Sequence, residues 1–412
     1  SNIEGLTFTN PIETASEYVD ILRDSSDVVI ALTHIGFAPN PASVEVDDNV
    51  DTYLATHVSG IDAIVGGHSH THPTDTRFIP APYQYLPTIL SNPDGVPVII
   101  GQANRYNTFL GEIIIGLRPK PVTTTSDAGI LSQAYEVVSR AGRAIEVKTA
   151  DHPEDPAIKG IVQPYADKLT AYNNTVIGQT ITPIDTLQAY TTETNGANLQ
   201  ADSSVWKLEK EKIEVDFHLS GAMTNRKIAD TATPSTPYSL KISDMFSAMP
   251  YENSLVVLRM NGPQIKRVLE RAYRNYYYYK YVPGYGGYSY YTTCMLDINA
   301  GSKITYFDTY PELPNGNNVA ALEFDGKRVD FNDATTYYNV STVNYLAAGS
   351  CNFNDSGVSL WPLDQIVADT QYYVRDAVIE YIQSKSEPIN PQIEGRLNIV
   401  VPVRLWMPVI SR

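Results

Sequence analysis

The sequence predicts an α/β protein, α+β overall, because two different patterns of predicted secondary structure follow one another along its 412 residues. In the first part, short apolar runs alternate with stretches of helical spacing, and strands separated by helices favour a parallel sheet covered by helices on both faces. In the second part, strands and turns dominate around two helices. A chain of this length holds two to three domains and buries a large core.

The first 118 residues contain short strand-like runs bounded by helical patterns. Residues 11–25, for example, place Ala15, Tyr18, Val19 and Leu22 at helical spacing. This pattern predicts helices over 11–25 and 50–58 and strands over 28–32, 61–65 and 96–100. We interpret residues 1–118 as the carboxyl-terminal part of a larger α/β domain.

The rest of the chain divides into a connection, a second domain and a tail. Residues 119–174 predict a linker and a helical connection, with a helix from about 131 to 172 broken near ADHPEDP. Residues 175–401 predict a second α/β domain with helices over 262–277 and 370–384. Residues 402–412 form a carboxyl-terminal tail.

Composition and charge exclude some classes of partner. The formal net charge is −16 and only 18% of residues are charged, so no basic surface for nucleic acid is predicted. No apolar run reaches the ~18 residues of a membrane span. A surface rich in Asn, Thr, Ser and Tyr, with 29 tyrosines in all, is typical of secreted, periplasmic or cell-surface proteins.

Histidines follow two of the predicted strands. The stretch IDAIVGGHSHTHP at 61–73 puts His68 and His70 just after one apolar run, and His34 follows the run at 28–32. Carboxyl ends of parallel strands meet at one edge of a sheet, and neutral imidazole is a common ligand of transition metals. In an extended segment, residues two apart point to the same side. The pattern therefore predicts a metal site at His34, His68 and His70, with His72 outside the ligand set.

The same segments resemble a known family. THIG at 33–36, GIDAIVGGHSHT at 60–71 and VPVIIGQANRYNTFLGEIII at 96–115 resemble the calcineurin-like metallophosphoesterase domain of the 5′-nucleotidase and UDP-sugar hydrolase family. Five later stretches resemble its 5′-nucleotidase-type carboxyl-terminal domain in the family's order. They are ETNGANLQADS at 193–203, VDFHLSGAMTNR at 215–226, ISDMFSAMPYENSLVVLRMNG at 242–262, VNYLAAGSCNF at 343–353 and IEGR at 393–396.

The resemblance implies a dimetal phosphohydrolase that cleaves nucleotide or related phosphomonoesters with metal-activated water. Two divalent ions, Zn, Mn or similar, are implied, with His34 and His68 on one and His70 on the other. Arg226 is implied to hold a substrate phosphate through its two-point guanidinium fork. Tyr345, together with Tyr288 as the best match for a second aromatic residue, is implied to stack on the base.

Several family features are absent. The D-x-H, G-D and G-N-H-D/E segments, which carry further ligands and the catalytic His, do not occur in catalytic-domain order. Asp216-Phe217-His218 has the letters of D-x-H but lies in a strand of the second domain, so we reject it as a ligand. We therefore expect an amino-terminal fragment of the same protein, roughly 150–200 residues long, to complete the site. The family's G-G-D turn is Gly349-Ser350-Cys351 here, so a surface or structural protein with reduced activity is the alternative function.

Two further features have two interpretations each. The tyrosine-rich stretch NYYYYKYVPGYGGYSYY at 275–291 is either a ring-stacking surface or an exposed variable loop. The two cysteines, Cys294 and Cys351, either form one bridge in an oxidising compartment or are unrelated buried thiols.

Overall fold

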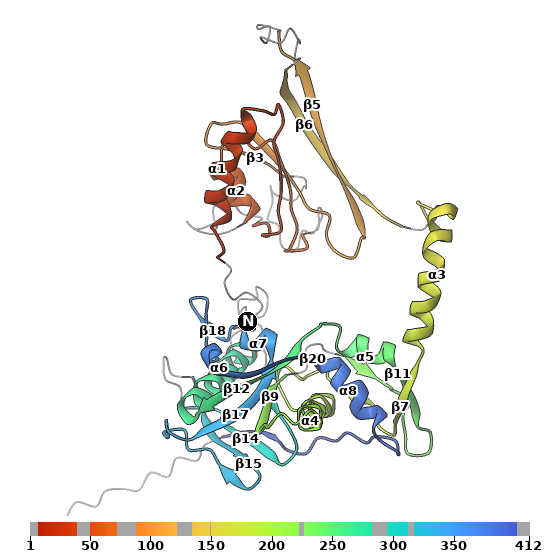
Figure 1. Ribbon diagram of the computed structural model, residues 1–412, viewed down its shortest axis with the longest axis vertical. Helices are drawn as coiled ribbons and strands as arrows, with labels where there is room; N and C mark the ends of the chain where they lie inside the picture. Colours follow the sequence, from red (N-terminus) through yellow and green to blue (C-terminus); the bar gives the residue numbers. More distant parts are fainter. Residues whose placement is uncertain are drawn as a thin grey trace, which may run out of the picture. The chain divides into compact units, whose positions relative to one another are not determined.

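The computed structural model forms two compact units, residues 1–162 and residues 163–412 (Figure 1). It describes residues 7–38, 50–71, 88–121, 134–148, 150–221, 226–281, 295–311 and 317–401. No helix within these ranges is long and apolar enough to cross a membrane. The mixture of helices and sheets confirms the predicted α/β class.

The first unit is built on a four-stranded sheet in the order β1-β2-β4-β3. The strands β1, β2 and β4 run parallel, as the alternation of strands and helices predicts, and β3 pairs antiparallel to β4. Helices α1 and α2 contact one another beside this sheet (Figure 1). The bounds are α1 Pro11–Arg23, β1 Ile30–Leu32, α2 Asp51–His57, β2 Ala63–Val65, β3 Thr88–Ser91 and β4 Pro97–Gly101.

Helix α1 begins where its sequence predicts. The side chain of Asn10 caps it by accepting hydrogen bonds from the backbone N–H groups of Ile12 and Glu13, and Pro11 fits the first helical position. The helix buries Val19 against the turn at Gly60, where a Cβ atom would lie 2.6 Å from the Val19 side chain. Gly60 also has φ +86°, so this close approach and this backbone conformation both require glycine.

A buried carboxylate ties the first unit together. Asp62, 3% exposed, accepts hydrogen bonds from the guanidinium groups of Arg23 on α1 and Arg140 and from the backbone N–H of Val29. Because the carboxylate is paired on both oxygens, its burial next to the sheet is compensated. Asp62 thus fixes α1 and a later hairpin to the start of β2.

That hairpin corrects one expectation. The helix predicted from about residue 131 is wrong over its first part, since β5 (Phe109–Pro119) pairs antiparallel with β6 (Tyr135–Glu146). Val137, Val138 and Ala141 have spacing that fits either structure, but Gly142 disfavours a helix by about 1 kcal/mol. The long ladder with β5 and the contact of Arg140 with Asp62 then favour the strand. The predicted break near 150–156 is followed by α3 (Pro156–Asn173), none of whose residues is buried.

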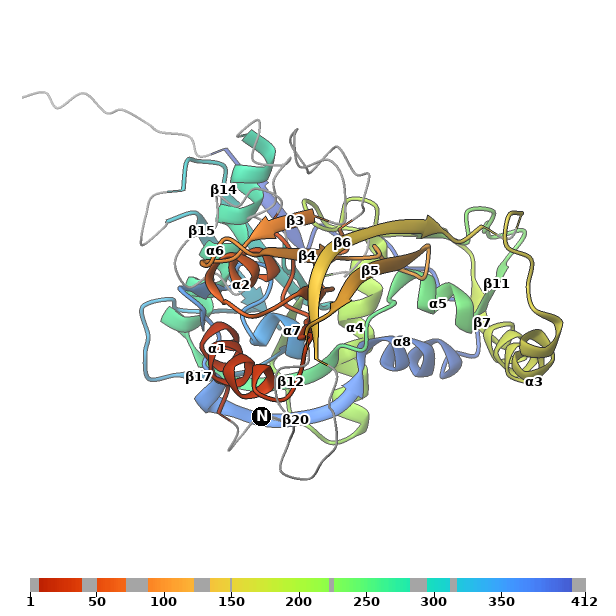
Figure 2. The same ribbon diagram turned by 90° about the horizontal axis from the view of Figure 1, so that it is seen from above.

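The second unit contains a five-stranded mixed sheet in the order β13-β9-β17-β12-β20 and a four-stranded sheet in the order β16-β15-β14-β21. Helices α4 and α8 pack on one another, and α6 contacts both β12 and β15. Figure 2 shows these helices from a second direction. Three two-stranded pairs, β8 with β10, β7 with β11 and β18 with β19, complete the unit.

The bounds in the second unit are as follows: β7 Val176–Thr180, β8 Ile184–Asp185, α4 Asn195–Lys210, β9 Phe217–Ser220, β10 Lys227–Ile228, β11 Tyr238–Lys241, α5 Ile242–Ala248, β12 Ser254–Asn261, α6 Gly262–Tyr281, β13 Asp297–Ile298, β14 Ser302–Phe307, β15 Val319–Phe324, β16 Lys327–Arg328, β17 Tyr337–Val343, α7 Asn344–Ala347, β18 Asn354–Asp355, β19 Val358–Ser359, η2 Leu363–Gln365, β20 Ile366–Tyr373, α8 Val374–Gln383 and β21 Leu397–Val400.

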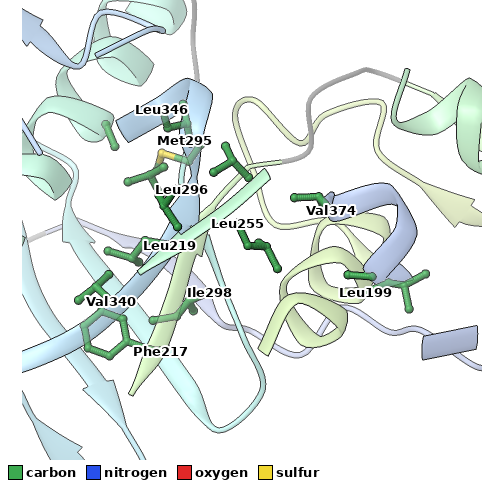
Figure 3. Packing of buried hydrophobic residues seen from close by; sticks show 14 of the residues in the cluster. Leu199, Phe217, Leu219, Leu255, Met295, Leu296, Ile298, Val340, Leu346 and Val374 are labelled. Carbon is green, nitrogen blue, oxygen red and sulfur yellow. The ribbon is translucent and has the colours of Figure 1, made fainter. Parts of the chain in front are cut away.

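The main core of the second unit joins its sheets and helices. Figure 3 shows Phe217 and Leu219 of β9 in one cluster with Val340 of β17, Leu199 of α4 and Val374 of α8. Each is buried, and burying such a side chain contributes about 1.5–3 kcal/mol. Segments far apart in the sequence therefore depend on one another for stability.

The helix predicted over 370–384 begins later than expected. Residues up to Tyr373 belong to β20, and α8 begins at Val374. The side chain of Thr370 donates a hydrogen bond to the Leu255 carbonyl of β12, which holds this segment on the edge of the sheet. No turn residue separates β20 from α8, so the sequence gives little indication of where the strand ends and the helix begins.

Candidate functional site

In the first unit, two of the three predicted histidine ligands come together at the carboxyl ends of parallel strands. His34 follows β1 and His68 follows β2, and their ring centroids lie 5.4 Å apart in an edge-on arrangement. Gly67 makes this approach possible, because a Cβ atom there would lie 2.8 Å from His34 Nδ1. Both imidazoles are exposed, so their nitrogens are open to a ligand from solvent.

The backbone at His70 departs from the expected extended segment. The extended segment expected through residues 68–70 is a turn, in which His68 has φ 79° and His70 has φ 53°. Left-handed backbone in residues other than glycine is uncommon and concentrates at functional sites. The two side chains therefore do not share one side of a strand, and the described residues contain no group of three or more His, Cys, Asp or Glu side chains placed to hold a metal ion.

Two residues that the sequence did not single out hold this turn. The buried amide of Gln102, which follows β4, donates to the Gly67 carbonyl at 2.9 Å and accepts from Ser69 Oγ and Thr71 N, each at 3.1 Å. Ser69 Oγ also accepts from Phe37 N at 3.1 Å, beside the loop that carries His34. Gln102 and Ser69 thus link the ends of three strands. The sequence contains one signal for Gln102, its position just after the apolar run 96–100 and Gly101.

A buried carboxylate lies behind the histidines. Asp51, fully buried, accepts from Thr33 Oγ1 at 2.6 Å through Oδ1, whereas its Oδ2 has no hydrogen-bond partner among the described residues. Burial raises the pKa of Asp51, and the Thr33 hydroxyl, the Gln102 amide and the nearby His34 act in the opposite direction. Gly66 is needed here, since a Cβ atom would lie 1.9 Å from Asp51 Oδ2. A buried carboxylate near the His34 imidazole suits a site for a cation.

In the second unit, Arg226 and Tyr345 border the same loop, residues 186–192. At one end, Thr186 exchanges hydrogen bonds with the Arg226 backbone at 2.7–2.9 Å, and the exposed Arg226 side chain has no hydrogen-bond partner among the described residues. Tyr190 lies near the other end of the loop. Burial raises its pKa, and electrostatic interactions with Tyr251 and Tyr345 raise it further. The Tyr345 ring is 45% exposed. Tyr288 lies outside the described residues.

Tyr345 sits at the start of a tightly held turn. In α7, Asn344 Oδ1 accepts from the N–H groups of Ser254 and Tyr345, at 3.1 and 2.8 Å. The altered turn that follows has left-handed residues at Gly349, Cys351 and Asn352. Cys351 is disulfide-bonded, and Cys294 lies outside the described residues.

Helix α6 holds this turn from the other side. The buried Asn275 donates to the Cys351 carbonyl and accepts from Asn352 Nδ2, each at 3.0 Å. Arg271 donates to the Asn354 carbonyl at 2.6 Å. These bonds stabilise a strained turn whose family counterpart has more glycine.

Two further family motifs contact one another in the second unit. Glu193 accepts hydrogen bonds from Asn198 Nδ2 at 2.7 Å and from the backbone N–H groups of Glu394 and Leu397, at 2.7 and 3.3 Å. The stretches ETNGANLQADS and IEGR therefore meet, and the first anchors the second. His218 lies fully buried on β9.

Comparison with known proteins gives one family. Residues 176–355 match the model of the 5′-nucleotidase carboxyl-terminal domain. The chain is 25% identical over 402 residues to the trifunctional nucleotide phosphoesterase protein YfkN of Bacillus subtilis, covering 96% of this chain and 23% of that protein. It is 26% identical over 283 residues to the 5′-nucleotidase of Bos taurus, covering 66% of this chain and 44% of that protein. The chain thus spans less than half the length of these two relatives.

The fold is shared with solved structures. A putative 5′-nucleotidase from Staphylococcus aureus in complex with alpha-ketoglutarate gives a TM-score of 0.60 at 18% identity, over 96% of this chain and 69% of that chain. The 5′-nucleotidase precursor from Thermus thermophilus gives 0.53 at 22%, over 96% and 68%. Residues 176–355 are therefore a 5′-nucleotidase carboxyl-terminal domain, and the chain as a whole is homologous to 5′-nucleotidases and nucleotide phosphoesterases.

Proposed function

We propose that the protein is a metal-dependent phosphohydrolase acting on nucleotides or related phosphomonoesters. The observation that carries this proposal is the pair of imidazoles from His34 and His68, fixed at neighbouring strand ends with rings 5.4 Å apart. The names of the relatives, which include 5′-nucleotidases and a nucleotide phosphoesterase, support the substrate class.

The residues present fit part of a two-metal site. His34 and His68 would hold one divalent ion, such as Zn²⁺ or Mn²⁺, and His70 would hold the second after a small change of its turn. When bound, such ions polarise a phosphoryl oxygen and lower the pKa of a bound water. Two imidazoles are fewer ligands than a catalytic zinc site uses, which is three protein ligands with one open position. The further ligands and the catalytic His would come from an amino-terminal segment of the same protein.

This chain's own residues would bind and orient the substrate. The exposed guanidinium of Arg226 can form a two-point contact with a phosphate, since no described residue occupies its donors. Tyr345 offers a half-exposed ring to a nucleobase, and the tight turn after α7 limits its movement. Tyr288 would provide the opposite ring face. Such an enzyme would work outside the cytoplasm, as a secreted, periplasmic or cell-surface protein, like the relative named as a snake venom 5′-nucleotidase.

The test measures bound metal and phosphate release in the full-length protein. We expect divalent metal and hydrolysis of adenosine monophosphate, and we expect His34→Ala and His68→Ala each to lose both. His152→Ala is the matched control, because this exposed histidine of the same unit lies in a turn away from the strand ends. Full activity in the two strand-end variants would refute the proposal. A metal-free, inactive wild-type protein would instead favour a surface or structural role.

A further inference from the structure

One buried side chain of the first unit has no part in the proposed catalytic roles, yet it lies among the residues that carry the paired histidines. Gln102 follows β4 and is 5% exposed. A buried primary amide needs hydrogen-bond partners for its oxygen and for its N–H groups. The partners of Gln102 therefore show which parts of the site it holds.

The Gln102 amide contacts the turn after β2 at three points. Its Nε2 donates to the Gly67 carbonyl at 2.9 Å, and its Oε1 accepts from Thr71 N and from Ser69 Oγ, each at 3.1 Å. These partners flank both histidines of the turn, whose φ angles are 79° and 53°. Residues other than glycine rarely adopt such conformations, so the turn depends on these hydrogen bonds.

The same network reaches the loop after β1 through the Ser69 hydroxyl. Its single proton goes to the amide oxygen, so Ser69 Oγ accepts from Phe37 N at 3.1 Å and from Thr71 Oγ1 at 2.8 Å. Phe37 lies three residues after His34 in that loop. One amide therefore fixes the loop of His34 and the turn of His68 relative to each other.

The directions of these bonds require an amide at this position. Thr71 N can only donate to the side chain, whereas the Gly67 carbonyl can only accept from it. A glutamate of the same shape keeps two acceptors but places a carboxylate oxygen against the Gly67 carbonyl. An aliphatic side chain of similar length leaves the buried polar groups of the turn without their partner, which is costly.

We propose that Gln102 is a positioning residue for the metal site: it holds the His34 and His68 rings, with centroids 5.4 Å apart, close enough to share one divalent ion. Gln102 acts through the turn and through Ser69, and it is not itself a ligand. The inference rests on the proposed function, because the two imidazoles are ligands only in that proposal. Groups that orient metal ligands without touching the ion change metal affinity by about 10–100-fold when they are lost.

Zinc affinity of the full-length protein, measured by competition with a chelating dye, tests the proposal. We expect Gln102→Glu and Gln102→Met each to bind zinc at least about tenfold more weakly. The added negative charge would attract a cation, so weaker binding by Gln102→Glu reports lost geometry. Gln383→Glu is the control, because it makes the same change of charge at an exposed position on α8. Wild-type affinity in both Gln102 variants would overturn the proposal.

A metal-free measurement separates this proposal from the proposed function. Nuclear Overhauser effects between the His34 and His68 rings are recorded with labelled histidine in the full-length protein without metal. We expect a cross-peak in the wild type and in Gln383→Glu, and its loss in both Gln102 variants. A cross-peak that persists in those variants would overturn the proposal. A wild-type protein that binds no zinc, with the cross-peak lost in the variants, would refute the proposed function and leave the positioning of the two rings by Gln102 established.

A milder variant keeps the proposal testable if the Gln102 variants do not fold. Ser69→Ala removes the connection to Phe37 and leaves the bonds of the amide to Gly67 and Thr71 in place. We expect it to weaken both zinc binding and the cross-peak between the rings. Wild-type values for both in Ser69→Ala would show that the network does not set the spacing of the histidines.

Discussion

The guanidinium of Arg396 and the carboxylate of Asp202 form a two-point ion pair between positions 194 residues apart, with Nη1–Oδ1 at 2.7 Å and Nη2–Oδ2 at 2.9 Å. Arg396 is 5% exposed, and it also donates to the Ile298 carbonyl of β13. The pair therefore fixes the segment before β21 to helix α4 and to the five-stranded sheet.

Breaking this pair should destabilise the second unit. Asp202→Ala removes the two-point partner of the buried guanidinium and leaves Glu394, at 2.9 Å, as its one ion-pair partner among the described residues, so we expect the free energy of unfolding to fall by about 1.5–3 kcal/mol. Tryptophan fluorescence during urea unfolding measures this, because Trp206 and Trp361 lie in the second unit. Asp230→Asn is the control, since its pair with Lys227 is exposed and worth about 0–1 kcal/mol. Equal effects of the two substitutions would contradict the structural role of the motif.

His218 should make the second unit sensitive to acid. Burial lowers its pKa from 6.5 to about 3, and its Nδ1 lies 2.7 Å from Ser341 Oγ. The unfolded chain binds this proton more readily, so stability is complete above pH 6.5 and is lost as the pH falls towards 3. The loss between pH 6.5 and 5 should be about 2 kcal/mol, at 1.36 kcal/mol per pH unit. His218→Gln should remove this component of the urea-unfolding profile, and an unchanged slope would count against it.

Asp297 should act in the opposite sense. Asp297 is fully buried, and its carboxylate has no hydrogen-bond partner among the described residues. Burial raises its pKa well above 3.8, and the charge of Glu193 adds to this effect, whereas the charge of Arg396 opposes it. The folded state therefore keeps a proton that the unfolded state releases. Its contribution to stability is complete below pH 3.8 and is lost as the pH rises through the folded-state pKa. Asp297→Asn should flatten the decline in unfolding free energy towards pH 8, and a steeper decline would contradict this assignment.

Gly67 should be essential for the proposed metal site. In Gly67→Ala the new methyl group meets His34 Nδ1 at 2.8 Å, so the His34 ring has to shift from its present position. We expect divalent metal affinity, measured by competition with a chelating dye, to fall roughly tenfold. Gly160→Ala provides the control because a Cβ atom there meets no atom within 4 Å. Unaltered affinity in Gly67→Ala would show that His34 is not a ligand.

Tyr345 should contribute to nucleotide affinity through its ring. Tyr345→Ala should lose about 1–3 kcal/mol of binding free energy for adenosine monophosphate at the catalytic site, the value of one base stacked on an aromatic ring. Tyr345→Phe keeps the ring and should bind normally. The Michaelis constant for hydrolysis by the full-length protein measures the difference. If both variants behaved like the wild type, the ring would have no part in binding the base.

The sequence by itself determined the α/β class, the order of most elements and the position of the histidines at strand ends. These depend on local information: runs such as 61–65 have strand composition, and Gly66 and Gly67 end the strand. The family motifs likewise identified Glu193, Asp202 and Arg396 without showing that they contact one another.

Only the tertiary structure decided how these parts are used. Residues 135–146 became a strand because a partner strand was available, and their local pattern, apart from Gly142, also fits a helix. His68 and His70 lie in a left-handed turn held by hydrogen bonds from Gln102 and Ser69, and the period-two argument for a strand cannot anticipate that turn. The contact between Arg396 and Asp202 joins segments far apart in the sequence. Its formation depends on the packing of the whole second unit, which no local pattern of residues specifies.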